Sequence, residues 1–89
     1  MNVSTLLSGL KIDLGITTTA YDVRLTAYLT RALEEIEREG VTLSDSVSDQ
    51  NLVINYAAWM WRKRDTGEGI PRMIRWQINN RLFGKDESE

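Results

Sequence analysis

The stretch "SDQNLVINYAAWMWRKR" (residues 48–64) decides the fold, because it predicts a long helix that is apolar on more than one side. At helical spacing its apolar residues form two stripes: Leu52, Val53, Tyr56, Ala57 and Met60 in the first, and Ile54, Ala58 and Trp61 in the second, with Trp59 near the edge. A helix that is apolar nearly all round lies at the centre of a fold or faces a partner. We therefore expect the rest of the chain, or another molecule, to surround this segment.

Two helices are predicted before it. The first begins after a possible N-cap at Ser4 and ends by Gly15, and its apolar side consists of leucines. The second starts near Tyr21, keeps helical apolar spacing as far as Ile36, and has Gly40 as its C-terminal stop. The loop "VTLSDSVSD" (residues 41–49) separates it from the central helix.

The boundaries of the central helix and of a fourth helix follow from local signals. Ser48 is the predicted N-cap of the central helix, which runs from about Asp49 to Arg64. After a loop around "TGEGI", Pro71 occupies the first turn of the last helix and Gly84 follows its end. No segment alternates with period two. The predicted fold class is all-α: a small bundle of about four helices, with two long central helices plus a short N-terminal and a C-terminal helix.

The last helix also carries two apolar stripes, namely Ile70, Ile74, Ile78 and Leu82 in one, and Met73, Trp76 and Phe83 in the other. In so small a domain both stripes of both helices are hard to bury internally. Either they all form the core of a monomer, or some are covered by another subunit. We predict that Trp59 belongs to the core, and that Trp61, Met73 and Trp76 lie on faces that contact a partner.

Length and composition exclude several classes of function. The 89 residues predict one domain over residues 1–89, with about 4–83 ordered and 85–89 frayed. The chain has no cysteine and no histidine, so disulfides and the usual nucleophile–base arrangements are absent, and a zinc site would need carboxylates alone. Its neighbouring carboxylates, such as Glu34 with Glu35 and Asp65 with Glu68, are typical of solvated surfaces. We predict no enzyme, no cofactor and no metal.

Charge divides the chain into two parts. Residues 1–49 hold four basic and eight acidic residues, whereas residues 50–85 hold seven basic and two acidic ones, within a net charge of −2. The candidate basic contacts are Arg62, Arg64, Arg72 and Arg75. The last two lie at the N-terminal end of their helix, where a cation is unfavourable, which indicates an anion or a carboxylate from elsewhere. No secretory signal opens the chain and no apolar run spans a bilayer, so we expect a soluble intracellular protein with no membrane partner.

The stretch "VSDQNLVINYAAWMWRKRDTGEGIPRMIRWQINNRLFG", preceded by "LGITTTAYDVRLTAYLTRALEEIEREG", resembles the phage head–tail connector family, small adaptor or head-completion proteins often labelled DNA-packaging proteins. The features that carry the resemblance are the opening helix ending in "LGI", the "TTTAYD" entry to a long amphipathic helix, the central helix, and the closing "MIRWQINNRLF". They extend from about Leu6 to Phe83.

The resemblance implies a helical protomer that assembles into a ring of about a dozen copies under cyclic symmetry. Such a ring lies beneath the portal protein at the head–tail junction of a virion, extends the DNA channel, and receives a stopper or tail protein. It would assemble in the host cytoplasm, and DNA would pass without sequence-specific binding. Its interfaces would be heterologous, so that one side of each protomer meets a different side of its neighbour.

Two other functions fit the residues. A small DNA-binding module for packaging or regulation would use the last helix for recognition, since Arg72, Arg75, Gln77, Asn79 and Asn80 can reach phosphates or base edges. The negative total charge and the apolar stripes on the same helix count against it. A monomeric or dimeric partner-binding bundle with no phage role is the third possibility.

Overall fold

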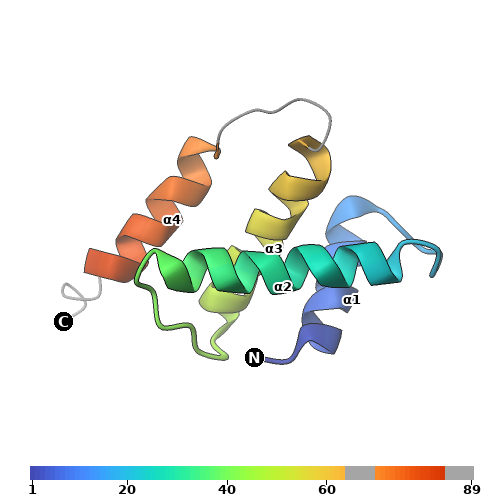
Figure 1. The fold of residues 1–89 in the computed structure, drawn as a ribbon, viewed down its shortest axis with the longest axis horizontal. Coiled ribbons are helices and arrows are strands. Elements are labelled where there is room, and N and C mark those ends of the chain that lie inside the picture. Colours follow the sequence, from blue (N-terminus) through green and yellow to red (C-terminus); the bar gives the residue numbers. More distant parts are fainter. Residues whose placement is uncertain (64–69, 84–89) are drawn as a thin grey trace.

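Four helices and no strand make up the part of the chain that the structure, a computed structural model, describes: residues 1–63 and 70–83 (Figure 1). The helices are α1 (Val3–Leu14), α2 (Asp22–Arg38), α3 (Val47–Lys63) and α4 (Arg72–Phe83). They pack as a compact bundle in which α2 and α3 are longest. The predicted all-α class is confirmed. Arg64, Asp65, Glu68, Gly84 and the 85–89 tail lie outside the described residues.

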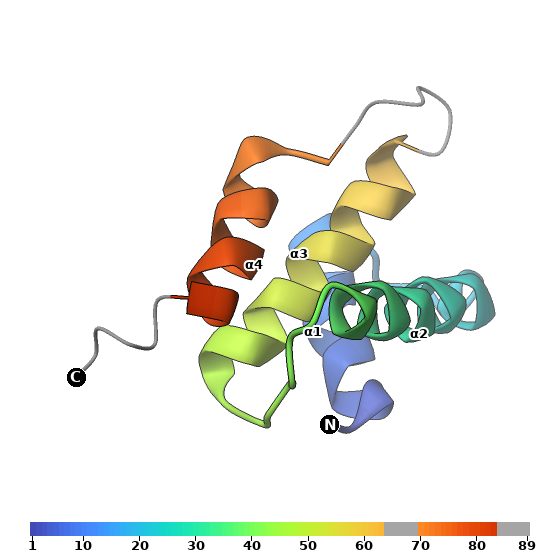
Figure 2. The same ribbon diagram turned by 60° about the vertical axis from the view of Figure 1, so that its left-hand side comes forward.

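The helix α3 lies at the centre, with α1 and α2 on one side and α4 on the other (Figure 2). Its first predicted stripe is buried throughout. On the second, Ala58 is buried, and Ile54 and Trp61 pack partly against the core. This helix is therefore apolar nearly all round because its own chain surrounds it. The fully buried side chains of the other helices are mostly leucine, alanine and isoleucine, contributed by Leu6, Leu10, Leu25, Leu29, Ala32, Ile36 and Ile78.

Two helix starts differ from the predictions. Asn2, not Ser4, caps α1: its Oδ1 accepts a hydrogen bond from the Ser4 N–H at 2.8 Å. The helix α3 begins at Val47, and Ser46, not Ser48, lies at the capping position, where its Oγ accepts from the Asp49 N–H at 3.2 Å. Both regions are rich in residues that can cap, and the sequence does not rank neighbouring candidates, because each would satisfy the same free N–H groups.

Glycines act at two points in α1. Gly15 caps the C-terminal end of the helix with φ of 73°, a left-handed conformation that glycine adopts readily, and the predicted end by Gly15 is confirmed. Gly9 lies where α1 meets α3, and a Cβ at this position would come within 2.8 Å of Ile54 Cδ1. The missing side chain therefore lets the two helices approach closely.

Candidate interaction surface on the fourth helix

The helix α4 is joined to the bundle by a narrow apolar contact flanked by two ion pairs. Ile74 and Ile78 are buried against the core, and Ile70 and Leu82 are partly buried. Of the two apolar stripes that the sequence shows on the last helix, the one that contains these residues therefore faces inward. The two ion pairs join Arg75 to Glu39 and Arg81 to Asp49.

The deepest polar group of the described chain is the carboxylate of Asp49, which is 1% exposed and lies in the first turn of α3. Arg81 of α4 contacts both of its oxygens, with Nε 2.5 Å from Oδ1 and Nη2 3.0 Å from Oδ2. Ser44 donates to Oδ2 from its N–H at 2.8 Å and from its hydroxyl at 2.9 Å. Arg81 also donates to the Thr42 carbonyl at 2.6 Å, so one arginine ties α4 to the 39–46 connection and to the start of α3.

Burial alone would raise the pKa of Asp49, but the hydrogen bonds from Arg81 and Ser44 outweigh it and leave this pKa below its ordinary value. The carboxylate is thus held ionised inside the fold. Sequence reasoning missed both Asp49 and Arg81 as a pair. The available signal was the opposite charge of the two parts of the chain, since the acid lies in the first part and the arginine in the second.

The second ion pair joins Arg75 to Glu39, the residue that follows α2. Its two guanidinium nitrogens lie 3.2 and 3.3 Å from the two carboxylate oxygens. The hydrogen bond from Arg75 holds the pKa of Glu39 below its ordinary value. The expectation that Arg75 finds a carboxylate from elsewhere is met within the chain, and this arginine is not left for a partner.

The outward side of α4 forms a surface that we call the α4 face: Arg72, Met73 and Trp76. Met73 is 70% exposed and Trp76 is 62% exposed. Arg72 is exposed too, and no residue of the described chain forms an ion pair with it. These three side chains line one shallow surface depression whose walls are almost wholly apolar. Of the predicted contact residues, the structure therefore brings these three together.

The other tryptophans lie differently from the prediction. Trp61 packs edge-on against Tyr21 and Tyr28, with ring centroids 5.4 and 6.1 Å apart, so it joins α3 to α2 instead of lying on an uncovered face. Trp59 is only partly buried; it packs edge-on against Tyr56 at 5.4 Å, and the Lys63 ammonium lies 4.9 Å from its ring centroid. The predicted roles of these two residues were assigned from stripe positions, which do not show that Tyr21, just before α2, and Tyr28, within α2, lie opposite Trp61.

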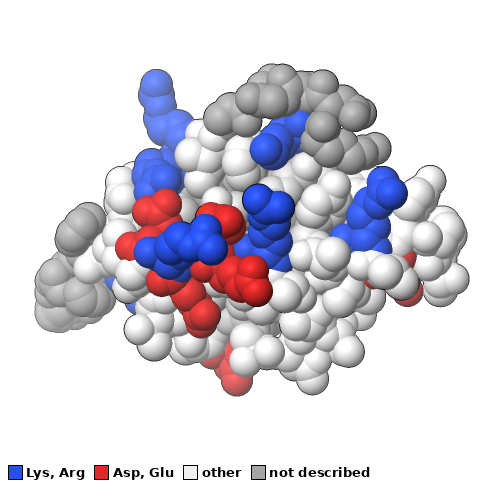
Figure 3. All heavy atoms as spheres, viewed as in Figure 1, with Lys and Arg blue, Asp and Glu red and all other residues white. Residues whose placement is uncertain are grey.

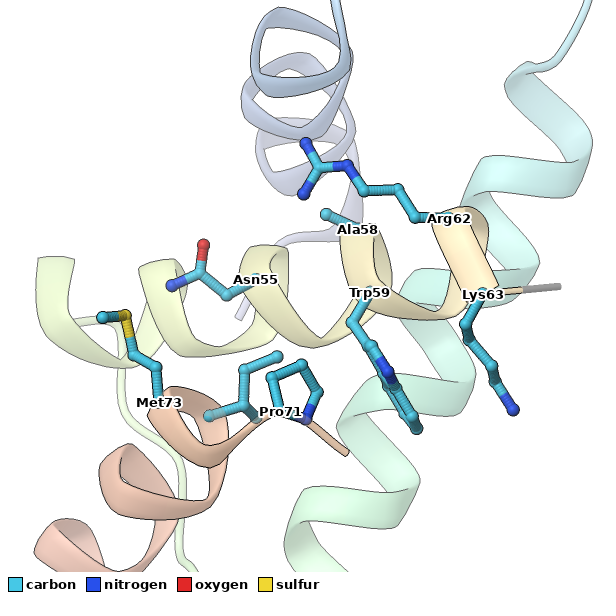
Figure 4. A pocket seen from close by; sticks show the side chains of 8 residues that line it. Asn55, Ala58, Trp59, Arg62, Lys63, Pro71 and Met73 are labelled. Atoms are coloured by element: carbon cyan, nitrogen blue, oxygen red, sulfur yellow. The ribbon is translucent and has the colours of Figure 1, made fainter. Parts of the chain in front are cut away.

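A groove of about 380 Å³ separates the end of α3 from the start of α4 (Figure 4). Trp59 and Pro71 lie side by side in it, and Met73 reaches its rim. Arg62 also lines the groove, but its guanidinium is directed away from α4, toward Asp13 of α1, where the N···O distance is 3.7 Å. Among the described residues that line the groove there is no carboxylate.

Comparisons with protein families, characterised proteins and solved structures found no match. Within residues 1–63 and 70–83 no three Asp, Glu, His or Cys side chains are placed so that they could hold a metal ion. In the same ranges no helix is long and apolar enough to cross a membrane. The α4 face exposes two large apolar side chains, Met73 and Trp76, on one side of one helix.

Proposed function

We propose that this chain is a structural subunit of a phage or prophage head–tail connector, which forms a ring beneath the portal, extends the DNA channel and joins the capsid to the tail. The observation that carries the proposal is the α4 face. Trp76 and Met73 are mostly exposed, and Arg72 beside them has no ion-pair partner in the described chain. Large exposed apolar side chains next to an unpaired charge are typical of a surface that a second subunit covers.

The arrangement of the bundle supports an assembly role. The inward side of α4 is fully used by isoleucines and two ion pairs, so its outward apolar residues are not needed for the fold of the monomer. The four-helix architecture agrees with what the family resemblance implies. In this proposal the protein works by binding its neighbours, with self-contacts around the ring and contacts to the portal on one side and the tail or stopper on the other.

The alternative of a DNA-binding module has less support from the geometry. It relied on five polar residues of α4, but Arg75 is paired with Glu39, and Gln77 accepts a hydrogen bond from Asn55 at 3.4 Å. Arg72, Asn79 and Asn80 are exposed, yet they share the outward side with Trp76 and Met73. A helix that reads a DNA groove presents mainly polar and basic side chains there.

The test is the mass of the purified protein, measured by light scattering over a concentration series, with and without the portal ring of the same genome. We expect closed rings that form at high protein concentration or on the portal, and electron microscopy of negatively stained particles would show their symmetry. A strict monomer that ignores the portal would contradict the proposal. Binding to duplex DNA that persists at physiological salt and depends on Arg72 would favour the alternative.

A further inference from the structure

A second uncovered surface lies on the solvent side of α2, which we call the α2 face: Val23, Ala27, Thr30 and Glu34. These residues recur at helical spacing on the side opposite the buried Leu25, Leu29 and Ile36. All four are exposed, and Val23 is 87% exposed. The face changes character along its length, from an apolar start to an acidic end. Acidic side chains gather over the C-terminal half of α2, interleaved with basic ones (Figure 3).

From these two faces we infer that the α4 face of one copy packs against the α2 face of a second copy, with Arg72 paired to Glu34. The inference rests on the proposed function and deepens it by naming the surfaces that meet between neighbouring subunits.

Charge complementarity is the first argument. Neither Arg72 nor Glu34 forms an ion pair within the described chain, although most other charged residues of these helices do. Arg72 lies in the first turn of α4, at the positive end of the helix dipole, and Glu34 lies about one turn before the end of α2, toward the negative end. Each charge is thus at the end of its helix where the dipole repels it. An ion pair between two copies would offset this repulsion for both residues.

The spacing of the two faces is the second argument. Trp76 follows Arg72 by four residues, and Thr30 precedes Glu34 by four residues, so both pairs span about 6 Å along their helices. When the helices run antiparallel with Arg72 at Glu34, Trp76 lies opposite Thr30 and close to Ala27. These two small side chains leave room for an indole ring between the helices. Met73 and Val23 supply further apolar surface on the two sides.

The contact is heterologous, because the two faces belong to different helices and neither pairs with itself. Each copy can therefore bind one neighbour through α4 and another through α2, and repetition of this contact gives a ring or a filament. This is the type of interface that a connector ring requires.

The experiment compares Trp76→Ala, Arg72→Glu and Glu34→Arg with the wild-type chain in sedimentation velocity over a concentration series. We expect Trp76→Ala to weaken self-association at least tenfold, because a tryptophan at the centre of an interface dominates its affinity. Ile12→Ala is the matched control, since Ile12 is an 81% exposed apolar residue on α1, outside both faces. Unchanged circular dichroism and melting temperature would show that the exposed substitutions leave the fold intact.

The charge variants give the sharper result. Each alone should assemble poorly, because it places two like charges at the contact. An equimolar mixture of Arg72→Glu and Glu34→Arg should recover assembly, since every contact between unlike copies then joins opposite charges. The double variant should recover it as well.

The outcomes separate the two proposals. If the wild-type chain forms rings and the three variants do so equally well, the connector role stands and this interface is wrong. If Trp76→Ala loses portal binding but keeps self-association, the α4 face meets the portal and the inferred contact between copies is also wrong. A wild-type chain that stays monomeric with and without the portal ring contradicts both.

Discussion

Replacing Arg81 with methionine should destabilise the fold far more than the same change at Arg72. Both arginines belong to α4, but Arg81 is bound to a carboxylate that is almost completely removed from water, whereas Arg72 is exposed and forms no ion pair within the described chain. Methionine keeps most of the aliphatic length, so the comparison isolates the guanidinium group. Without that group, Asp49 keeps only the two hydrogen bonds from Ser44.

The magnitude follows from the burial of the two partners. Removing one member of a buried ion pair costs about 3 to 5 kcal/mol, because the other charge stays buried without compensation. The Arg81 side chain is 31% exposed, so water reaches part of the pair and replaces some of the lost interaction. We therefore expect a loss of about 2 to 4 kcal/mol in the free energy of unfolding, which in a domain of this size lowers the melting temperature by at least about 8 °C.

Urea unfolding followed by tryptophan fluorescence measures this loss directly. Arg72→Met is the control, and its effect should stay within about 0.5 kcal/mol, as for other surface positions. A double-mutant cycle with Asp49→Asn should give a coupling energy of about 1 to 3 kcal/mol between the two side chains. Equal and small losses in Arg81→Met and Arg72→Met would refute the view that this ion pair fastens α4 to the bundle.

Two further predictions concern the same core. The difference in stability between wild type and Arg81→Met should be largest near neutral pH and shrink in acid. The reason is that an Asp whose native pKa is lowered contributes stability above its unfolded pKa of about 3.9 and loses this contribution as the pH falls through the native pKa. A difference in urea midpoints that stays constant down to pH 2 would argue against the ionised Asp49 as the source of this stability. Gly9→Leu should lower the free energy of unfolding by about 1 to 3 kcal/mol, because the new side chain meets Ile54; Ser8→Leu, on the exposed side of α1, is the control and should change it little.

Much of the fold could be predicted from the sequence, because the kind of secondary structure and the number of helices depend on local apolar spacing and on stop signals. Gly15 is an example, since a glycine after the apolar spacing of Leu6, Leu7 and Leu10 predicts the end of the first helix, and α1 ends there. The two stripes of α3 left open whether this helix is central or faces a partner, and the structure shows that it is central. Helix starts were less predictable: Ser46 and Ser48 are both competent caps, and the difference lies in which one the preceding loop places at the free N–H groups.

Long-range partners could not be predicted in the same way. Periodicity shows how wide the apolar side of a helix is, but not which neighbour packs against it, so Trp61 was assigned to a partner, whereas in the structure it is partly buried and packs edge-on against Tyr21 and Tyr28. Asp49 and Arg81 are 32 positions apart and belong to different helices, so local spacing in the sequence does not show that they meet. The division of charge along the chain was taken to favour contacts with a partner, and it did not show that acidic and basic residues of the same chain pair.

The energetics of the α4 face explain why the proposed ring would need more than one contact or a template. A tryptophan side chain has up to about 250 Å² of surface, so the 62% exposure of Trp76 leaves about 150 Å² to be covered. Covering this area contributes about 3 to 4 kcal/mol. Association of two proteins loses about 4 to 15 kcal/mol in translational and rotational freedom, so Trp76 alone cannot hold two subunits together. Met73 and the pairing of Arg72 with Glu34 would add to it, and a portal ring that holds neighbouring copies close together would raise their effective concentration. On this reasoning the subunit remains monomeric at low concentration and assembles where a template gathers it. The contact between two subunits then draws its binding energy from Trp76, Met73 and Arg72 on the outward side of α4.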